Sequence, residues 1–182
     1  QSLSEIVRRH EILRTTYHFD SDDPVQRVED PAALSLPLCD LSGMPEPERS
    51  AELASRLRRE IREPFDLERG LPCRFRLLKV ADDEHIFSIV LHHIACDGWS
   101  LEVLLRELSR LYEVFELGRP SPLPELPLQF ADFAQWQQAT FTGDTLDIDF
   151  AGSALRMAAG INCPISLPES AAFTAFRCLS KR

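Results

Sequence analysis

The sequence lacks any long apolar run, and no stretch approaches the roughly 20 residues that a helix needs to cross a bilayer. It does not open with a basic segment followed by an apolar one, the pattern of a secretory signal peptide. No Lys/Arg cluster interrupts the net charge of −9, a charge that nucleic acids and anionic membrane surfaces repel. We therefore expect a cytoplasmic protein that binds neither nucleic acid nor membranes.

Paired cysteines are also missing. The five cysteines are scattered, odd in number and without C-x-x-C spacing: Cys39, Cys73, Cys96, Cys163 and Cys178. This pattern is typical of reduced thiols in a cytosolic protein rather than of a disulfide framework. The 182 residues, 44% hydrophobic and 27% charged, suffice for one globular domain with a single core.

Hydrophobic periodicity predicts alternating helices and strands. Helices are expected at residues 2–14, 48–63, 100–117 and 130–138, and strands at 15–19, 25–29, 72–80 and 85–92. Residues 30–47 and the proline-rich residues 119–128 are interpreted as connections. The strand at 85–92 is apolar almost throughout, so we expect it to be central and covered on both faces. The order of elements indicates an α/β fold with a mixed sheet.

Two local details are also predicted. Ser2-x-x-Glu5 has the form of a capping box at the start of the first helix. The aromatic stripe of Phe130, Phe133 and Trp136 is expected to lie in the core.

The segment His92-His93-Ile94-Ala95-Cys96-Asp97-Gly98 joins the apolar strand to the next helix. Adjacent strand residues point to opposite faces, so one histidine should pack into the sheet and the other should turn toward a cleft. An imidazole that titrates near neutral pH could serve as a general base. A histidine that is merely hydrogen-bonded into the core is the competing interpretation.

The remaining residues of this segment have several possible roles. Gly98 permits close backbone approach, and Asp97 could cap the following helix or hold a cation. His92, His93, Cys96 and Asp97 are all metal-ligand types, but adjacent histidines on opposite faces do not converge easily on one ion, so no metal is expected. Nothing nearby indicates an activated thiolate at Cys96, which we interpret as a small buried filler.

Residues 92–98 resemble the HHxxxDG motif of condensation domains from nonribosomal peptide synthetases. Three further segments resemble motifs of that family in the same order. Residues 9–17 (RHEILRTTY) resemble RHExLRTxF, and residues 65–72 (FDLERGLP) resemble FDLxxGP. Residues 118–136, with the proline-rich linker and FADFAQW, resemble the segment that ends in YxDYAxW.

The resemblance implies a chloramphenicol acetyltransferase-like lobe. The implied reaction is amide formation between aminoacyl or peptidyl thioesters carried on the 4′-phosphopantetheine arms of carrier-protein domains. An adenylation domain would lie in the same synthetase, and no cofactor would bind this domain directly. Two alternatives stay open: an acyl-CoA-dependent O- or N-acyltransferase of the same superfamily, and a catalytically silent condensation-like docking domain.

The resemblance also implies roles for individual residues. His93 would be catalytic, contacting the α-amino group of the acceptor as a base or as an orienting group. Gly98 would leave room for substrate, and His92 would be structural. Asp97 would pair with Arg14 to hold the loop, whereas without the family Arg14 could equally be a solvated helix-end charge.

The resemblance covers residues 1–140, interpreted as a partial condensation domain, its amino-terminal lobe. Residues 141–182 match no motif of the family and are interpreted as a non-family tail, with truncation, a reading-frame change or disorder as open explanations. The family would place further residues before Gln1 and a second lobe after Trp136. We therefore expect a fragment that is inactive alone.

Overall fold

The computed structural model describes residues 1–20, 23–140 and 171–179. Its helices are α1 (Ser2–Arg9), the 3₁₀ helix η1 (Glu11–Arg14), α2 (Glu48–Arg62), α3 (Gly98–Glu116) and α4 (Phe130–Thr140). Its strands are β1 (Thr15–Asp20), β2 (Asp23–Val28), β3 (Leu38–Asp40), β4 (Cys73–Ala81), β5 (Glu84–His92) and β6 (Ala171–Leu179). Within these residues, no helix combines the length and the apolar character that a membrane span requires.

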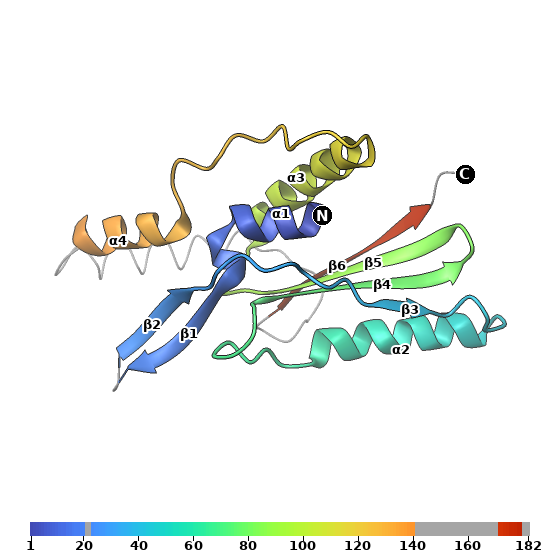
Figure 1. The fold of residues 1–182 in the computed structure, drawn as a ribbon. Coiled ribbons are helices and arrows are strands. Elements are labelled where there is room, and N and C mark those ends of the chain that lie inside the picture. The colour runs from blue at the N-terminus through green and yellow to red at the C-terminus, as the bar shows by residue number, and fades with distance from the viewer. Residues whose placement is uncertain (21–22, 141–170, 180–182) are drawn as a thin grey trace.

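The main sheet has four strands in the order β3-β4-β5-β6 (Figure 1). Strand β3 runs parallel to β4, whereas the β4–β5 and β5–β6 pairs are antiparallel. Strands β1 and β2 form a separate antiparallel hairpin. The predicted α/β architecture with a mixed sheet is therefore confirmed, and β5 occupies an interior position between β4 and β6.

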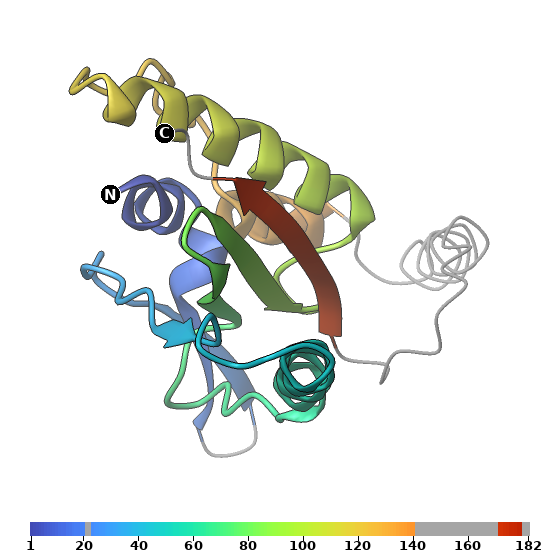
Figure 2. The ribbon, with the colours of Figure 1, turned by 90° about the vertical axis from the view of Figure 1, so that its right-hand side faces the viewer.

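Helices cover both faces of the main sheet: α1 and α3 lie on one face and α2 on the other (Figures 1 and 2). An apolar cluster lies under α1 and α3, and its buried members are Ile6, Val7, Leu13, Cys73, Phe75, Ile89, Leu91, Cys96, Leu104 and Leu111. In β4 and β5, the members of this cluster alternate along the strand, as expected when one face of a strand packs against helices. This packing fixes the end of β5 and the start of α3, between which the 92–98 segment runs.

The opposite face of the sheet holds a buried polar contact. Glu60 of α2 is 7% exposed and accepts a 2.7 Å hydrogen bond from the Ser88 hydroxyl of β5, which is 1% exposed. The Arg76 Nε atom of β4 lies 2.5 Å from the other carboxylate oxygen of Glu60. These bonds satisfy a carboxylate that would otherwise be costly to bury, and they join α2 to two strands.

The amino-terminal segment differs from its prediction. Helix α1 begins at Ser2 with Gln1 as its N-cap, and no side chain makes the cap hydrogen bond. The expected capping box is wrong because Ser2 lies inside the helix rather than before it. The helix also ends earlier than expected, since His10 is extended (φ −100°, ψ 95°) and separates α1 from η1.

The prediction for α4 is right in secondary structure and wrong in burial. Phe130, Phe133 and Trp136 are 48%, 50% and 56% exposed, so they are not core residues within the described structure. Their rings touch in series, with centroid separations of 6.4 and 5.8 Å. A helical stripe shows that a face is apolar but does not identify what covers it, and α4 lies apart from the main sheet (Figure 1).

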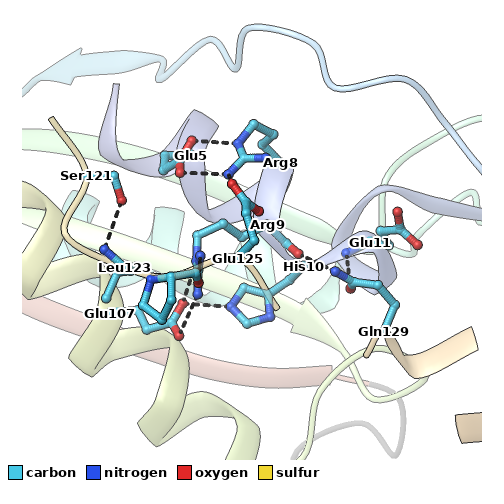
Figure 3. Close-up of polar contacts among 11 residues, drawn as sticks. Glu5, Arg8, Arg9, His10, Glu11, Glu107, Ser121, Leu123, Glu125 and Gln129 are labelled. Carbon is cyan, nitrogen blue, oxygen red and sulfur yellow. Dashed lines mark hydrogen bonds and ion pairs between the residues drawn. The ribbon is translucent and has the colours of Figure 1, made fainter. Parts of the chain in front are cut away.

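A cluster of charged side chains fastens the proline-rich linker to the helices (Figure 3). The carboxylate of Glu107 on α3 lies 2.8 Å from the His10 ring and 3.3 Å from the Arg9 guanidinium. Arg9 also donates a 2.7 Å hydrogen bond to the carbonyl of Pro124, and its own carbonyl accepts one from the Gln129 side chain at 2.9 Å. The first motif, residues 9–17, therefore anchors the segment that leads into α4.

Candidate active site

His92 is the last residue of β5 and lies on the face that carries Ser88, because alternate strand residues share a face. Its ring meets Phe65 edge-to-face, with centroids 5.6 Å apart and planes at 84°. Its Nδ1 atom accepts a 3.1 Å hydrogen bond from the Ile94 backbone N–H, so the proton of the neutral ring lies on Nε2. Burial, with a smaller contribution from His93, lowers the pKa of His92 and favours this neutral form.

His93 is exposed in the turn that follows β5. Its Nδ1 atom lies 3.2 Å from the carbonyl oxygen of Cys96. Because a carbonyl oxygen only accepts, Nδ1 carries the proton and Nε2 of the neutral ring keeps its lone pair. The prediction that the two histidines differ in packing is confirmed, and a cleft beside His93 stays a prediction.

Asp97 is the N-cap of α3, one of the two roles the sequence left open for it. Its carboxylate accepts hydrogen bonds from the Ser100 N–H at 2.7 Å and from the Ser100 hydroxyl at 2.6 Å. These bonds lower the pKa of Asp97 because they stabilise the charged form. The carboxylate therefore fixes the point at which the 92–98 segment becomes a helix.

The predicted ion pair between Asp97 and Arg14 is wrong for the part of the chain that the structure describes. Arg14 binds Glu11, with a nitrogen–oxygen distance of 3.0 Å, and donates to the backbone carbonyl of Glu29. Its side chain is 12% exposed, so it is not a solvated helix-end charge either. Both ends of the expected pair have nearer partners: Glu11 lies on the same 3₁₀ helix as Arg14, and Ser100 lies one turn from Asp97.

Gly98 is the first residue of α3, and the space beside its Cα atom is not filled by distant parts of the described chain. Apart from its chain neighbours and the backbone of its own helix, a Cβ atom built at this position would meet no atom of the described residues within 4 Å. The close backbone approach that the sequence suggested is therefore not made by the described chain. The space that the missing side chain leaves open stays available to another group.

Cys96 is 5% exposed, and burial together with the nearby charge of Asp97 raises the pKa of its thiol to about 12. The thiol is therefore neutral, and its interpretation as a small buried filler is confirmed. Within the described residues, no three His, Cys, Asp or Glu side chains are grouped as a metal site would require.

The 65–72 segment forms a compact turn beside the site. The Asp66 carboxylate accepts hydrogen bonds from the Glu68 and Arg69 N–H groups, both at 3.2 Å. Gly70 donates a 2.8 Å hydrogen bond to the Asp66 carbonyl, which would lie only 3.0 Å from a Cβ at position 70. Glycine is therefore favoured there by close approach. Sequence reasoning identified this segment by resemblance but missed the contact of Phe65 with His92, which no local pattern indicates.

A family model described as "Condensation domain" matches residues 1–147. The chain belongs to the condensation-domain family. The match runs past the boundary predicted at residue 140, so residues 141–147 fall inside it. That the rest of the predicted tail, which includes β6, stands outside the family stays a prediction.

Curated relatives of this condensation-domain chain include large synthetases. It is 48% identical to chondramide synthase cmdD of Chondromyces crocatus over 141 residues, which are 78% of this chain and 4% of the relative. It is 41% identical to one polypeptide of the linear gramicidin synthase of Brevibacillus parabrevis over 145 residues, which are 80% of this chain and 3% of the relative. The chain therefore spans only a small part of either relative's length.

A solved structure has the same fold. The X-domain from teicoplanin biosynthesis superposes with a TM-score of 0.68 at 34% identity, covering 76% of this chain and 29% of that one. The same X-domain has been solved in a complex with OxyB.

Proposed function

We propose that this condensation-domain chain supplies the histidine motif for amide formation between carrier-bound thioesters in nonribosomal peptide synthesis. One observation carries the proposal: within a family match over residues 1–147, the HHIACDG segment holds His93 Nδ1 3.2 Å from the Cys96 carbonyl, which leaves Nε2 of the neutral ring available. The similarity of the chain to chondramide synthase and linear gramicidin synthase supports carrier-bound thioesters as the substrate class.

The chemistry assigned to His93 is modest. The α-amino nitrogen of the acceptor attacks the thioester carbonyl of the donor, the C–N bond forms, and the C–S bond breaks. The amine loses a proton, and the departing thiolate gains one. Nε2 of His93 takes or orients that amine proton, and positioning alone can supply several kcal/mol of the barrier.

The other motif residues hold the site. His92 is structural, since its Nδ1 is occupied by the Ile94 N–H. Asp97 fixes the start of α3, and Arg14 stabilises η1 through Glu11. Gly98 keeps open a space that the acceptor substrate would enter.

The proposed partners follow from the same reaction. Donor and acceptor are held as thioesters on 4′-phosphopantetheine arms of peptidyl and aminoacyl carrier-protein domains, and an adenylation domain of the synthetase loads them. The chain itself needs no bound cofactor in this scheme, and the cytoplasm is the expected compartment.

The substrate class can be tested in a chimera. Residues 1–140 replace the corresponding stretch of chondramide synthase, where the identity is 48%. We expect the chimera to join an aminoacyl donor to an aminoacyl acceptor when both are loaded on carrier proteins, with the dipeptidyl thioester detected by mass spectrometry. Product from acyl-CoA and a free amine or alcohol, with none from loaded carriers, would favour the acyl-CoA alternative and overturn the proposal.

A docking role is the second candidate, favoured by the likeness to an X-domain that has been solved with OxyB bound. A chimera that folds and binds loaded carriers, yet makes no product with any donor, would support this role instead.

A further inference from the structure

We propose that Phe65 is a positioning residue for the reaction: through His92 it fixes the turn that presents His93. The inference rests on the proposed function for its kinetic consequence only. Its structural part concerns the contacts among Phe65, His92 and the turn, which can be measured without any substrate.

The ring of Phe65 is held on two sides. The guanidinium carbon of Arg74 lies 3.9 Å from the Phe65 ring centroid, a cation–π contact. The His92 ring meets Phe65 edge-to-face at 5.6 Å, a favourable aromatic geometry. Phe65 therefore lies between a strand β4 cation and the last side chain of strand β5.

Arg74 is itself fixed, so it cannot follow Phe65 if the ring moves. Its guanidinium donates hydrogen bonds to backbone carbonyls at the end of α2 and just beyond it: 3.0 Å to Glu60, 2.5 Å to Glu63 and 3.0 Å to Pro64. These carbonyls have no partner inside the helix, and a cation at a helix C-terminus is favourable. The end of α2 thus sets the position of the Phe65 ring.

His92 transmits this position to the turn. Its backbone N–H donates to the Pro72 carbonyl at 2.9 Å, and its carbonyl accepts from the Ala95 N–H at 3.0 Å. Its ring Nδ1 accepts from the Ile94 N–H at 3.1 Å. A change in the His92 ring plane would break this last bond, which spans the His93 position. The orientation of the His92 ring and the conformation of the turn are therefore coupled.

The hydrogen bond from the Ile94 N–H to His92 Nδ1 can be detected by spectroscopy. With Nδ1 accepting from Ile94, His92 must be neutral with its proton on Nε2. The Nδ1 atom of His93 lies beside the Cys96 carbonyl, so when that ring is neutral its proton lies on Nδ1, the opposite tautomer. The nitrogen chemical shifts of the two rings therefore report separately on the two halves of the coupling.

The first test uses the 182-residue chain with nitrogen-15-labelled histidine. In the unmodified chain we expect proton–proton contacts between the Phe65 and His92 rings, and a His92 ring fixed with its proton on Nε2. Phe65→Leu should mix the His92 tautomers, whereas Phe65→Tyr, which keeps the ring, should restore the fixed form. Phe19→Leu, at a 78% exposed phenylalanine of β1, is the matched control and should change neither ring.

Two results would overturn the structural part. One is the absence of ring contacts in the unmodified chain, a measurement that does not depend on any variant folding. The other is a Phe65→Leu chain that stays folded and keeps His92 in a single tautomer.

The kinetic part is tested in the chimera described above. We expect Phe65→Leu to lower kcat by roughly 10- to 100-fold with little change in the KM for the acceptor, because a small displacement of a catalytic group costs rate rather than binding. Rescue by Phe65→Tyr should accompany it. An unchanged kcat would overturn this part, whereas a parental chimera without activity would count against the proposed function and leave the histidine spectra to decide the structural claim.

Discussion

At the residue scale, the two adjacent histidines differ because their Nδ1 atoms face opposite kinds of partner. His92 Nδ1 faces an N–H group, and His93 Nδ1 faces a carbonyl oxygen. The first partner requires a lone pair and the second requires a proton. Only His93 therefore keeps an unprotonated Nε2 when neutral, which is the form that can accept a proton from an amine.

Asp97 should matter chiefly for stability. Asp97→Ala removes the N-cap of α3 and leaves the Ser100 N–H without its acceptor, so we expect a loss of about 1 kcal/mol in the free energy of unfolding. Urea unfolding at pH 7 measures it. Asp30→Ala, at an exposed position in the connection before β3, is the control and should lie within about 0.5 kcal/mol of the parent.

The same variant has a defined pH dependence. Because the folded-state pKa of Asp97 is lowered, its contribution is fully present above the unfolded pKa, about 4, and disappears as the pH falls through the folded value. The difference between parent and Asp97→Ala should therefore shrink in acid. A difference that grows below pH 4 would contradict the cap assignment.

The sequence predicted part of this site for clear physical reasons. Strand alternation separates the packing of His92 from that of His93, and a side chain just before a helix predicts the cap at Asp97. The partner of Arg14 could not be predicted this way. Its choice between Asp97 and Glu11 depends on where η1 lies in space, which local pattern does not encode.

At the element scale, α2 is joined to the sheet by a buried carboxylate. Ser88→Ala would leave one oxygen of Glu60 buried without its donor, so we expect a loss of about 1–3 kcal/mol in unfolding free energy. Ser35→Ala, in the exposed connection before β3, is the control and should be close to neutral. Equal effects for both variants, measured by urea unfolding, would show that the Ser88–Glu60 bond contributes nothing specific.

Glu107 supports the linker indirectly, through Arg9, which donates a hydrogen bond to the Pro124 carbonyl. Glu107→Gln keeps the shape of the side chain but removes the charge that faces Arg9, whose side chain is only 2% exposed. We expect a loss of about 3 kcal/mol, since removing one partner leaves a buried charge uncompensated. Faster amide hydrogen exchange in residues 119–130 should accompany it.

The control for that experiment is Glu102→Gln, at an exposed position on the same helix, which should leave both stability and exchange unchanged. Loss of stability without faster exchange in the linker would mean that Glu107 supports the core and does not hold the linker.

Most helices and strands could be predicted because each is long enough for its hydrophobic pattern to repeat several times. Strand β3, with three residues, is too short to produce a periodic signal, so the sequence assigned it to a connection. The predicted burial of the α4 aromatic residues was wrong for another reason. Periodicity locates an apolar face, but the neighbour of that face is a property of the tertiary arrangement.

At the scale of the whole molecule, three motifs that are distant in sequence meet around the end of β5. The Tyr17 N–H, in the 9–17 motif, donates a 2.8 Å hydrogen bond to the carbonyl of Leu67, in the 65–72 motif. Phe65, in the same 65–72 motif, contacts His92, in the 92–98 motif. The order and spacing of the motifs thus correspond to one packed unit, which explains why their joint resemblance predicted the family correctly.

The measurement that tests the central claim most directly is the rate of dipeptide formation on carrier proteins by the chimera with and without His93→Ala. We predict a loss of roughly 10²–10⁴ in kcat, the range for removal of a general base, while the unfolding free energy stays close to that of the parent. A His93→Ala chimera that forms peptide at the parental rate would contradict the assignment of His93 as the catalytic residue.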